Sequence, residues 1–252
     1  MNAVLKGILE TGNATSADGE TINAMSVGVP REEGEFLHAI VSEIKPATSV
    51  EVGLAYGVSA LFILDALRGT GQGHHIIIDY KQSSLWKGVG LKNLNEAGFK
   101  DLYEFREQPA HIALAQLEAQ GTQVDFAFID GKHLYDYTLV DFFCADRILK
   151  VGGIIAMDDL WMPSIQKVCA YILTNRAYSV YRTHAPGTDP IQSTGRKLLH
   201  QAAKLSPKMA KSLEPMFSRP DIQKKLGLPN SRWIAFKKEA EDERAWDYHE
   251  RF

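Results

Sequence analysis

Residues 48–61 read "TSVEVGLAYGVSAL", and this stretch decides the fold that the sequence predicts. A short β-branched strand carries Glu51 at its tip, a loop with Gly53 and Gly57 follows, and a helix begins near Ser59. Glycine permits a tight turn and a close backbone approach that a Cβ would obstruct, and Ser59 is placed to cap the helix. The first turn of a helix has free backbone N–H groups, so this unit predicts a nucleotide-type binding site. The alternative is a strand–helix turn that binds no ligand.

Predicted strands and helices alternate along the chain from this unit. Strands are expected to end near residues 79, 105, 130, 158, 183 and 238, and helices to span about 59–67, 89–97, 110–117, 135–149 and 164–174. This alternation predicts an α/β fold with a doubly wound, mostly parallel, seven-stranded sheet. Ligands of such sheets bind beyond the carboxyl ends of the strands, which here carry Glu51, Asp79, Asp130 and Asp158.

The chain of 252 residues fits a single domain with additions. We expect N-terminal helices and a lid over residues 1–46, a cofactor-binding core over 47–185, a helical insertion over 186–230, and a last strand with a tail over 231–252. The polar segment 11–26 is expected to be a loop or a mobile lid. Glu32 and Glu33 are interpreted as first-turn acids that complement the dipole of a helix opening at Pro30.

Charge and hydropathy limit the classes of partner. The net charge of −3 gives no overall attraction to nucleic acid or to a membrane. No apolar run approaches the roughly 20 residues of a membrane helix, and the N-terminus lacks a signal-peptide pattern. Cys144 and Cys169 lie in apolar runs typical of reduced thiols. We therefore expect a cytoplasmic protein that acts on a small molecule, without nucleic-acid or membrane partners. The basic insertion is interpreted as a solvated face, with closure over an anionic substrate as the alternative.

Four motifs in order resemble one enzyme family. The first is Glu-x-Gly-x-x-x-Gly-x-Ser at residues 51–59, and the second is "IIIDY" at 76–80. The third is the glutamine-containing loop "KQSSLWKGVGLKNLNEAGF" at 81–99, and the fourth is "FIDGKHLY" with "GGIIAMDD" between residues 128 and 159. Together these motifs resemble class I S-adenosylmethionine-dependent methyltransferases, in particular the bacterial O-methyltransferases similar to catechol and macrolide-sugar O-methyltransferases. The resemblance covers about residues 33–183. A nicotinamide-dependent oxidoreductase is the rival, but Ala55 breaks its G-x-G-x-x-G fingerprint.

The resemblance implies a cofactor site for S-adenosylmethionine. Asp79 would accept the ribose hydroxyls, as its position about 20 residues past the glycine loop also suggests. The remaining cofactor-binding candidates surround the methionine end and the adenine. They are Glu51, Gly53, Gly57 and Ser59 for the methionine end, Gln108 and Ala110 for the adenine, and Asp130.

The resemblance also implies a metal site and a general base. Asp130, Asp158 and Asp159 would hold Mg²⁺, which prefers carboxylate oxygens. His133 is the first candidate for the base and Lys132 the second, with Asp130 completing the catalytic set. In the alternative interpretation Asp130 acts without metal, Asp158 and Asp159 cap a helix, and Lys132 and His133 are structural. Sugar-modifying relatives carry an Asp where Lys132 stands, which argues against a sugar substrate.

The expected activity is O-methylation of a small hydroxylated metabolite, with S-adenosylmethionine as cofactor and Mg²⁺ as an open addition. The alternatives are a metal-independent N-methyltransferase and a non-catalytic or repurposed relative that only binds S-adenosylmethionine. A homodimer is the expected assembly, because the aromatic residues of the C-terminal tail are suited to a subunit contact.

Overall fold

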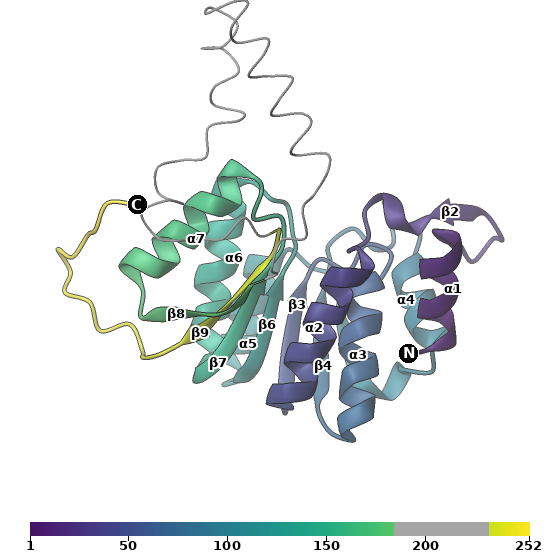
Figure 1. Ribbon diagram of the computed structural model, residues 1–252, viewed down its shortest axis with the longest axis horizontal. Coiled ribbons are helices and arrows are strands. Elements are labelled where there is room, and N and C mark those ends of the chain that lie inside the picture. Colours follow the sequence, from purple (N-terminus) through teal and green to yellow (C-terminus); the bar gives the residue numbers. More distant parts are fainter. Residues whose placement is uncertain (184–231) are drawn as a thin grey trace, which may run out of the picture.

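The computed structural model describes residues 1–183 and 232–252, and its centre is a seven-stranded sheet (Figure 1). The strand order is β5-β4-β3-β6-β7-β9-β8. Neighbouring strands from β5 to β7 are parallel, whereas β9 is antiparallel to both β7 and β8. The strands are β3 (Thr48–Val52), β4 (His74–Ile78), β5 (Tyr103–Arg106), β6 (Val124–Ile129), β7 (Leu149–Met157), β8 (Tyr178–Thr183) and β9 (Ile234–Lys238). The predicted fold class is confirmed. The predicted insertion at 186–230 lies outside the described residues.

Helices cover both faces of the sheet. One face is covered by α1 (Ala3–Thr11), α2 (Arg31–Ile44), α3 (Val58–Thr70) and α4 (Val89–Glu96), with short 3₁₀ turns η1 (Ala24–Ser26) and η2 (Lys100–Leu102). The other face is covered by α5 (Ala110–Ala119), α6 (Tyr135–Ile148) and α7 (Pro163–Asn175). Strand side chains alternate between the faces: Phe126 and Phe128 pack toward α1–α4, and Ala127 and Ile129 toward α5–α7.

Segment 11–26 is more ordered than a plain loop, so that part of the prediction is wrong. Two short strands, β1 (Asn13–Thr15) and β2 (Thr21–Asn23), pair as an antiparallel hairpin. The Ser16 hydroxyl closes the turn by accepting a hydrogen bond from Glu20 N at 2.9 Å. A side chain that bonds to its own backbone favours a turn, which is how a polar, small-residue segment forms a hairpin. Its role as a lid stays a prediction.

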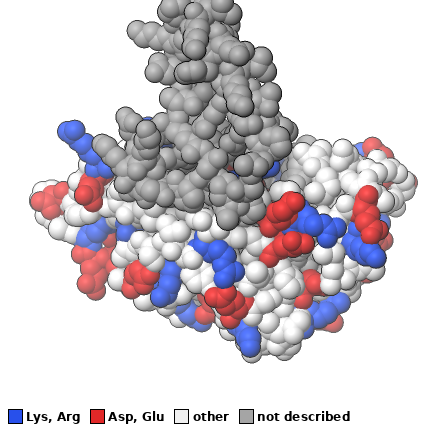
Figure 2. Space-filling view, viewed as in Figure 1, with Lys and Arg blue, Asp and Glu red and all other residues white. Residues whose placement is uncertain are grey.

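The mixed charge of the surface and the free state of the two cysteines agree with what the composition predicts. Figure 2 shows basic and acidic side chains interspersed on the visible face. Cys144 and Cys169 are free, and burial raises the pKa of the Cys169 thiol. Within residues 1–183 and 232–252, no helix combines the length and the hydropathy required to span a membrane.

Gly34 sets the close packing of α2 against α3. A Cβ at this position would lie 2.0 Å from Phe62 Cε2. Gly34→Ala should therefore lower the free energy of unfolding by about 1–3 kcal/mol, as overpacking does, although alanine favours helix. Urea denaturation measures this change. The control is Gly69→Ala in α3, where a Cβ meets nothing within 4 Å and the helix should be stabilised. Equal effects of the two substitutions would contradict the packing argument.

Candidate cofactor and catalytic site

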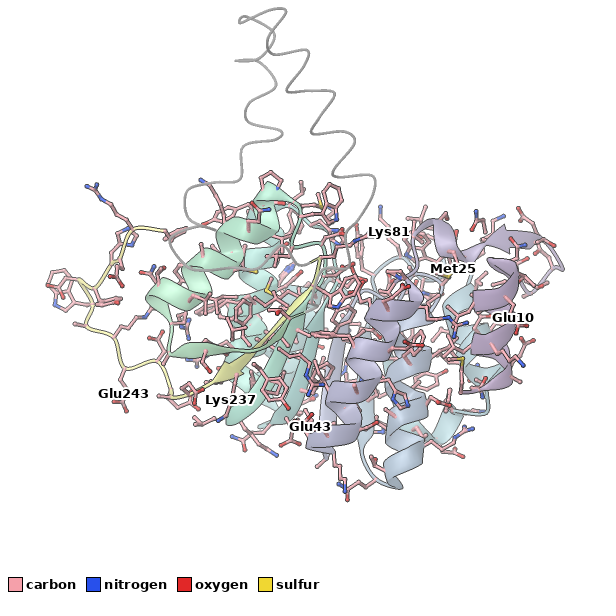
Figure 3. All side chains as sticks on the ribbon, in the orientation of Figure 1. Glu10, Met25, Glu43, Lys81, Lys237 and Glu243 are labelled. Atoms are coloured by element: carbon pink, nitrogen blue, oxygen red, sulfur yellow. The ribbon has the colours of Figure 1, made fainter. Side chains whose placement is uncertain are left out.

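A cavity of about 550 Å³ opens at the carboxyl edge of the sheet. It is bounded by the glycine loop after β3, the ends of β4 and β6, the start of α5 and one face of α6. Lys81, labelled in Figure 3, lines it just beyond β4. The predicted site residues that line this cavity are Gly53, Ser59, Asp79, Gln108, Ala110, Asp130, Lys132 and His133. Glu51, Gly57, Asp158 and Asp159 are not among its lining residues.

The glycine loop approaches the end of β6 very closely. Gly53 has φ +98°, and a Cβ there would lie 2.1 Å from the Asp130 carbonyl oxygen. Gly57 has φ +83°, and its Cβ would lie 3.2 Å from Gly90 O. Ala55 also has a positive φ of 45°, a conformation that costs free energy for a residue with a side chain. The loop is thus a tight cradle that only glycine permits at residue 53.

Asp79 holds this loop in place from the end of β4. Its Oδ2 accepts hydrogen bonds from Leu54 N at 3.1 Å and Ala55 N at 2.9 Å. Its Oδ1 accepts one from Lys81 N at 2.8 Å. The carboxylate is buried, yet it lines the cavity. Asp79 therefore connects the glycine loop to the place where the sequence predicts the ribose.

Glu51 lies behind the glycine loop and is fully buried. Ser59 Oγ donates a hydrogen bond to Glu51 Oε1, and His75 Nε2 lies 3.2 Å from Glu51 Oε2. The prediction that Ser59 caps α3 is wrong: the helix begins at Val58, Gly57 is the N-cap, and no side chain caps it. The glycine loop shifts the helix start toward the strand, so Ser59 falls inside the first turn and turns toward Glu51.

An acidic centre lies beside the cavity, where β6 and β7 end. His133 Nε2 lies 2.9 Å from Asp130 Oδ1, and His133 Nδ1 lies 2.7 Å from Asp159 Oδ2. The hydrogen bond to Asp159 raises the pKa of His133. Burial, together with the charge of Asp158, raises the pKa of Asp130 well above its usual range. The structure thus brings the predicted base and the predicted metal ligands together.

Asp158 and Asp159 differ in their electrostatic surroundings. Burial, together with the charge of Asp159, raises the pKa of Asp158 to about 6. Burial also acts to raise the pKa of Asp159, but hydrogen bonds from His133 and Trp161 outweigh it and leave that pKa lowered. Asp159 is therefore the ionised partner of His133.

Glu33 is a member of the centre that the sequence interpretation missed. It lies in the first turn of α2 and is 1% exposed. Burial, then the charge of Asp158, raises its pKa well above the usual range, and the two carboxyls share a hydrogen bond. Glu33 Oε1 is buried without a hydrogen-bond partner in the described part of the chain. Glu43 of the same helix lies at the opposite edge of the sheet (Figure 3).

The donor set fits Mg²⁺ in type, because it supplies hard carboxylate oxygens. The unpartnered Glu33 Oε1 adds acceptor capacity to it. However, His133 lies between Asp130 and Asp159 and bonds to both. Within residues 1–183 and 232–252, no three His, Cys, Asp or Glu side chains converge as ready metal ligands. A cation at this centre would therefore compete with the imidazole for two of the three predicted ligands.

Lys132 is held by aromatic rings at the edge of the cavity. Its Nζ lies 4.3 Å from the ring centroid of Tyr137 and 5.9 Å from that of Tyr80. The two tyrosines, Tyr137 first, raise the pKa of Lys132. A lysine acts as a base only when its pKa is depressed, and here it is raised. Lys132 is therefore the poorer candidate for the general base, and His133 remains the first.

Comparisons with known proteins agree with this fold. Residues 50–160 match the family of methyltransferase domains. The chain is 33% identical over 146 residues to the tapetum-specific methyltransferase 1 of Arabidopsis thaliana, covering 57% of this chain and 60% of that protein. It is 30% identical over 166 residues to caffeoyl-CoA O-methyltransferase of Populus kitakamiensis, covering 63% and 65% respectively. The chain thus spans less than two thirds of these relatives.

Solved structures share the fold. The O-methyltransferase of Bacillus cereus in complex with SAH has a TM-score of 0.57 and 21% identity, over 71% of this chain and 83% of that one. The O-methyltransferase TomG of Streptomyces achromogenes in complex with SAM has a TM-score of 0.60 and 17% identity, over 75% and 85%. The sheet order and these matches define a class I methyltransferase fold, with a methyltransferase domain over residues 50–160. The methyltransferase fold and domain predicted from the four motifs are confirmed.

Proposed function

We propose that this protein is an S-adenosylmethionine-dependent methyltransferase that O-methylates a small hydroxylated metabolite. The observation that carries the proposal is the position of Asp79, which lines the cavity while it fixes the glycine loop through Leu54 and Ala55. The cradle at Gly53 and the unpartnered Gln108 Oε1 also fit the cofactor. The relatives named as methyltransferase and caffeoyl-CoA O-methyltransferase support this choice of chemistry.

Methyl transfer requires the nucleophile, the methyl group and the sulfur to be held close and in line. When bound, S-adenosylmethionine supplies a methyl group activated by its sulfonium charge. The glycine loop and Asp79 would hold the cofactor, and the acidic centre would receive the acceptor hydroxyl beside it. His133 would take, at Nε2, the proton that this hydroxyl loses, with the hydroxyl replacing Asp130 as the partner of that nitrogen, while Nδ1 stays bonded to Asp159.

Mg²⁺ is proposed as an optional participant. Asp130, Asp158 and Asp159 would hold it, and His133 would first leave its position between two of them. A bound cation lowers the pKa of a coordinated hydroxyl. A metal-independent N-methyltransferase is the second candidate, favoured by the bridging position of His133. A non-catalytic relative that only binds S-adenosylmethionine is the third.

His133→Gln should separate catalysis from cofactor binding. We expect kcat to fall about 100-fold or more, because a positioned proton acceptor contributes on that scale. The dissociation constant for S-adenosylhomocysteine should stay nearly unchanged, because His133 is not among the residues proposed to hold the cofactor. Transfer of labelled methyl from S-adenosylmethionine to a panel of catechols measures kcat, with and without Mg²⁺. His38→Gln, a surface substitution on α2, is the control. An unchanged rate in His133→Gln would refute the assigned role.

We also propose a cytoplasmic homodimer. The C-terminal tail supports this assembly, because Trp246 is 97% exposed and an aromatic side chain of this size is suited to a subunit interface. Sedimentation equilibrium of the full chain tests the assembly, and a monomer at micromolar concentration would exclude it.

A further inference from the structure

Ala55, in the middle of the glycine loop, has a backbone conformation that needs support from outside the loop. Its φ of +45° lies in the left-handed region, which costs free energy for a residue with a Cβ. A strained residue keeps such a conformation only where its surroundings hold it there. The contacts that hold Ala55 therefore identify the side chains that keep the loop in shape.

Two side chains fix the two polar backbone groups of Ala55. Asp79 Oδ2 accepts a hydrogen bond from Ala55 N at 2.9 Å, and Gln82 Nε2 donates one to Ala55 O at 2.9 Å. Asp79 lines the cavity, whereas Gln82 does not. Gln82 is 0% exposed, so its hydrogen bond lies in a low-dielectric interior, where it is stronger than in water.

Gln82 connects the glycine loop to α4. Its Oε1 accepts a hydrogen bond at 3.1 Å from Gly90 N, in the first turn of that helix. Only one orientation of the amide makes both hydrogen bonds, because one neighbour is an acceptor and the other is a donor. A Cβ on Gly90 would lie 2.6 Å from Ala55 O, so the start of α4 packs directly against this carbonyl. The Gln82 amide and α4 therefore hold Ala55 O together.

Two further contacts attach the same segment to the glycine loop. Asn93 of α4, 2% exposed, donates from Nδ2 to Tyr56 O at 2.9 Å. The rings of Tyr56 and Trp86 meet edge to face with their centroids 5.2 Å apart, and both residues line the cavity. Two consecutive carbonyls of the loop, those of Ala55 and Tyr56, are thus bonded to buried amide side chains of the segment 82–93.

We propose that Gln82 is a positioning residue that keeps Ala55 in its left-handed conformation and so preorganises the glycine loop for S-adenosylmethionine. This inference rests on the proposed function, since it concerns how the loop is made ready for that cofactor. Gln82 acts through Ala55, because it does not itself line the cavity. A loop already held in its binding conformation loses less conformational entropy on binding, so loss of this support should weaken the cofactor.

Isothermal titration of the full chain with S-adenosylhomocysteine tests this role. Gln82→Met nearly keeps the size of the side chain but removes both hydrogen bonds, so the dissociation constant should rise about tenfold or more. The same substitution in a chain that carries Ala55→Gly should raise it about threefold or less, because glycine adopts a positive φ without strain. This dependence on residue 55 is a result that a merely structural role of Gln82 would not give.

Gln72→Met is the matched control. Gln72 is exposed, and its Nε2 also donates to a backbone carbonyl, that of Lys45. The control should leave the affinity as in the wild type. If Gln82→Met weakens binding by the same factor with alanine and with glycine at residue 55, or does not weaken it at all, the inference is overturned.

Gln82→Asn replaces Gln82→Met if the latter does not fold, since its amide is one methylene too short to reach Ala55 O. Failure of both variants to fold would show that the fold itself requires Gln82, and would overturn the positioning role. If the wild type does not bind S-adenosylhomocysteine, the proposed function fails and the inference fails with it. If the wild type binds but the effect of Gln82→Met does not depend on residue 55, the inference alone fails.

Discussion

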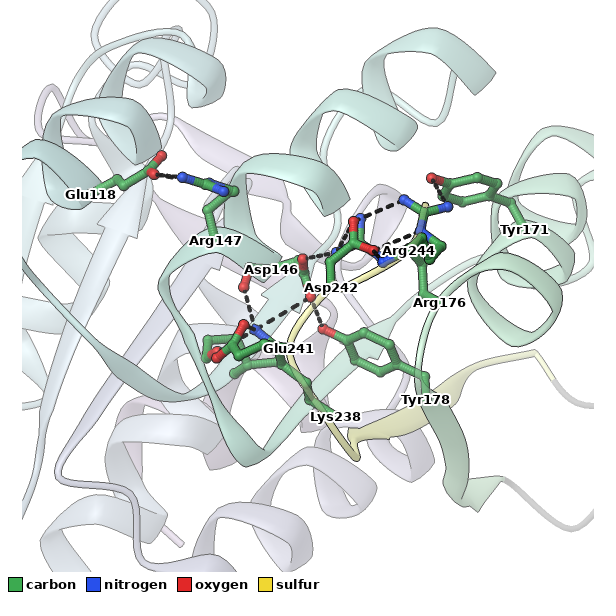
Figure 4. A network of polar contacts seen from close by, with 11 residues as sticks. Glu118, Asp146, Arg147, Tyr171, Arg176, Tyr178, Lys238, Glu241, Asp242 and Arg244 are labelled. Carbon is green, nitrogen blue, oxygen red and sulfur yellow. Dashed lines mark hydrogen bonds and ion pairs between the residues drawn. The ribbon is translucent and has the colours of Figure 1, made fainter. Parts of the chain in front are cut away.

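Replacing Asp146 with alanine should lower the free energy of unfolding by about 3–5 kcal/mol, the cost of breaking a buried ion pair from one side. Asp146 is 2% exposed on α6. It accepts hydrogen bonds from Arg176 and from the Tyr178 hydroxyl, the latter at 2.5 Å, and its Oδ1 lies 3.6 Å from Lys238 Nζ (Figure 4). The substitution would leave these three buried groups without their common acceptor.

The network around Asp146 also attaches the C-terminal tail to the sheet. Lys238, 1% exposed on β9, donates to the backbone oxygens of Asp146 and Leu149 at 2.9 Å each. Its Nζ lies 2.7 Å from Glu241 of the tail. Loss of Asp146 should therefore loosen the tail as well as α6, which hydrogen exchange of residues 239–252 would detect.

Urea denaturation followed by circular dichroism measures the change in stability. Arg147→Ala is the control on the next residue, since its exposed pair with Glu118 contributes little to stability. A loss below about 1 kcal/mol in Asp146→Ala would mean that the network is energetically neutral.

Replacing Asp79 with alanine should weaken S-adenosylhomocysteine binding about 100-fold or more. Two charge-assisted hydrogen bonds to the ribose would be lost, each contributing about 1.5–3 kcal/mol. The glycine loop would also lose the acceptor for Leu54 N and Ala55 N, so its cradle would no longer be preorganised. Isothermal titration measures the affinity.

Glu104→Ala is the matched control for Asp79, because Glu104 is an exposed acid on the neighbouring strand β5. It should leave the affinity unchanged. If Asp79→Ala bound S-adenosylhomocysteine as tightly as the wild type, the ribose assignment would have to be abandoned.

Local sequence patterns predicted the fold and the edge of the sheet at which the cavity opens. The alternation of apolar strands with helices is a short-range signal, and the carboxyl ends of parallel strands meet at one edge by geometry. Gly53 was identified for the right reason, because its positive φ and its contact with Asp130 exclude a side chain. Asp79 could be located because its spacing from the glycine loop is fixed by one helix and one strand.

The side-chain partners could not be predicted, because they come from elements far apart in the sequence. Glu33 reaches Asp158 across 125 residues, although its spacing of four from the buried Leu37 was a signal that it faces inward. His133 was predicted as the general base with a structural role as the alternative, and it lies between two carboxyl groups that follow different strands. Asp141 lies in the helix between the two halves of the fourth motif, and the structure places it in the cavity wall.

Calorimetric titration of the wild-type protein with S-adenosylmethionine, and separately with NADH, tests the central claim most directly. The account predicts binding of S-adenosylmethionine on the order of micromolar affinity, both in EDTA and in Mg²⁺, and no heat from NADH. Binding of NADH without any heat from S-adenosylmethionine would contradict the proposed function. It would favour the alternative that the cavity binds a nicotinamide cofactor.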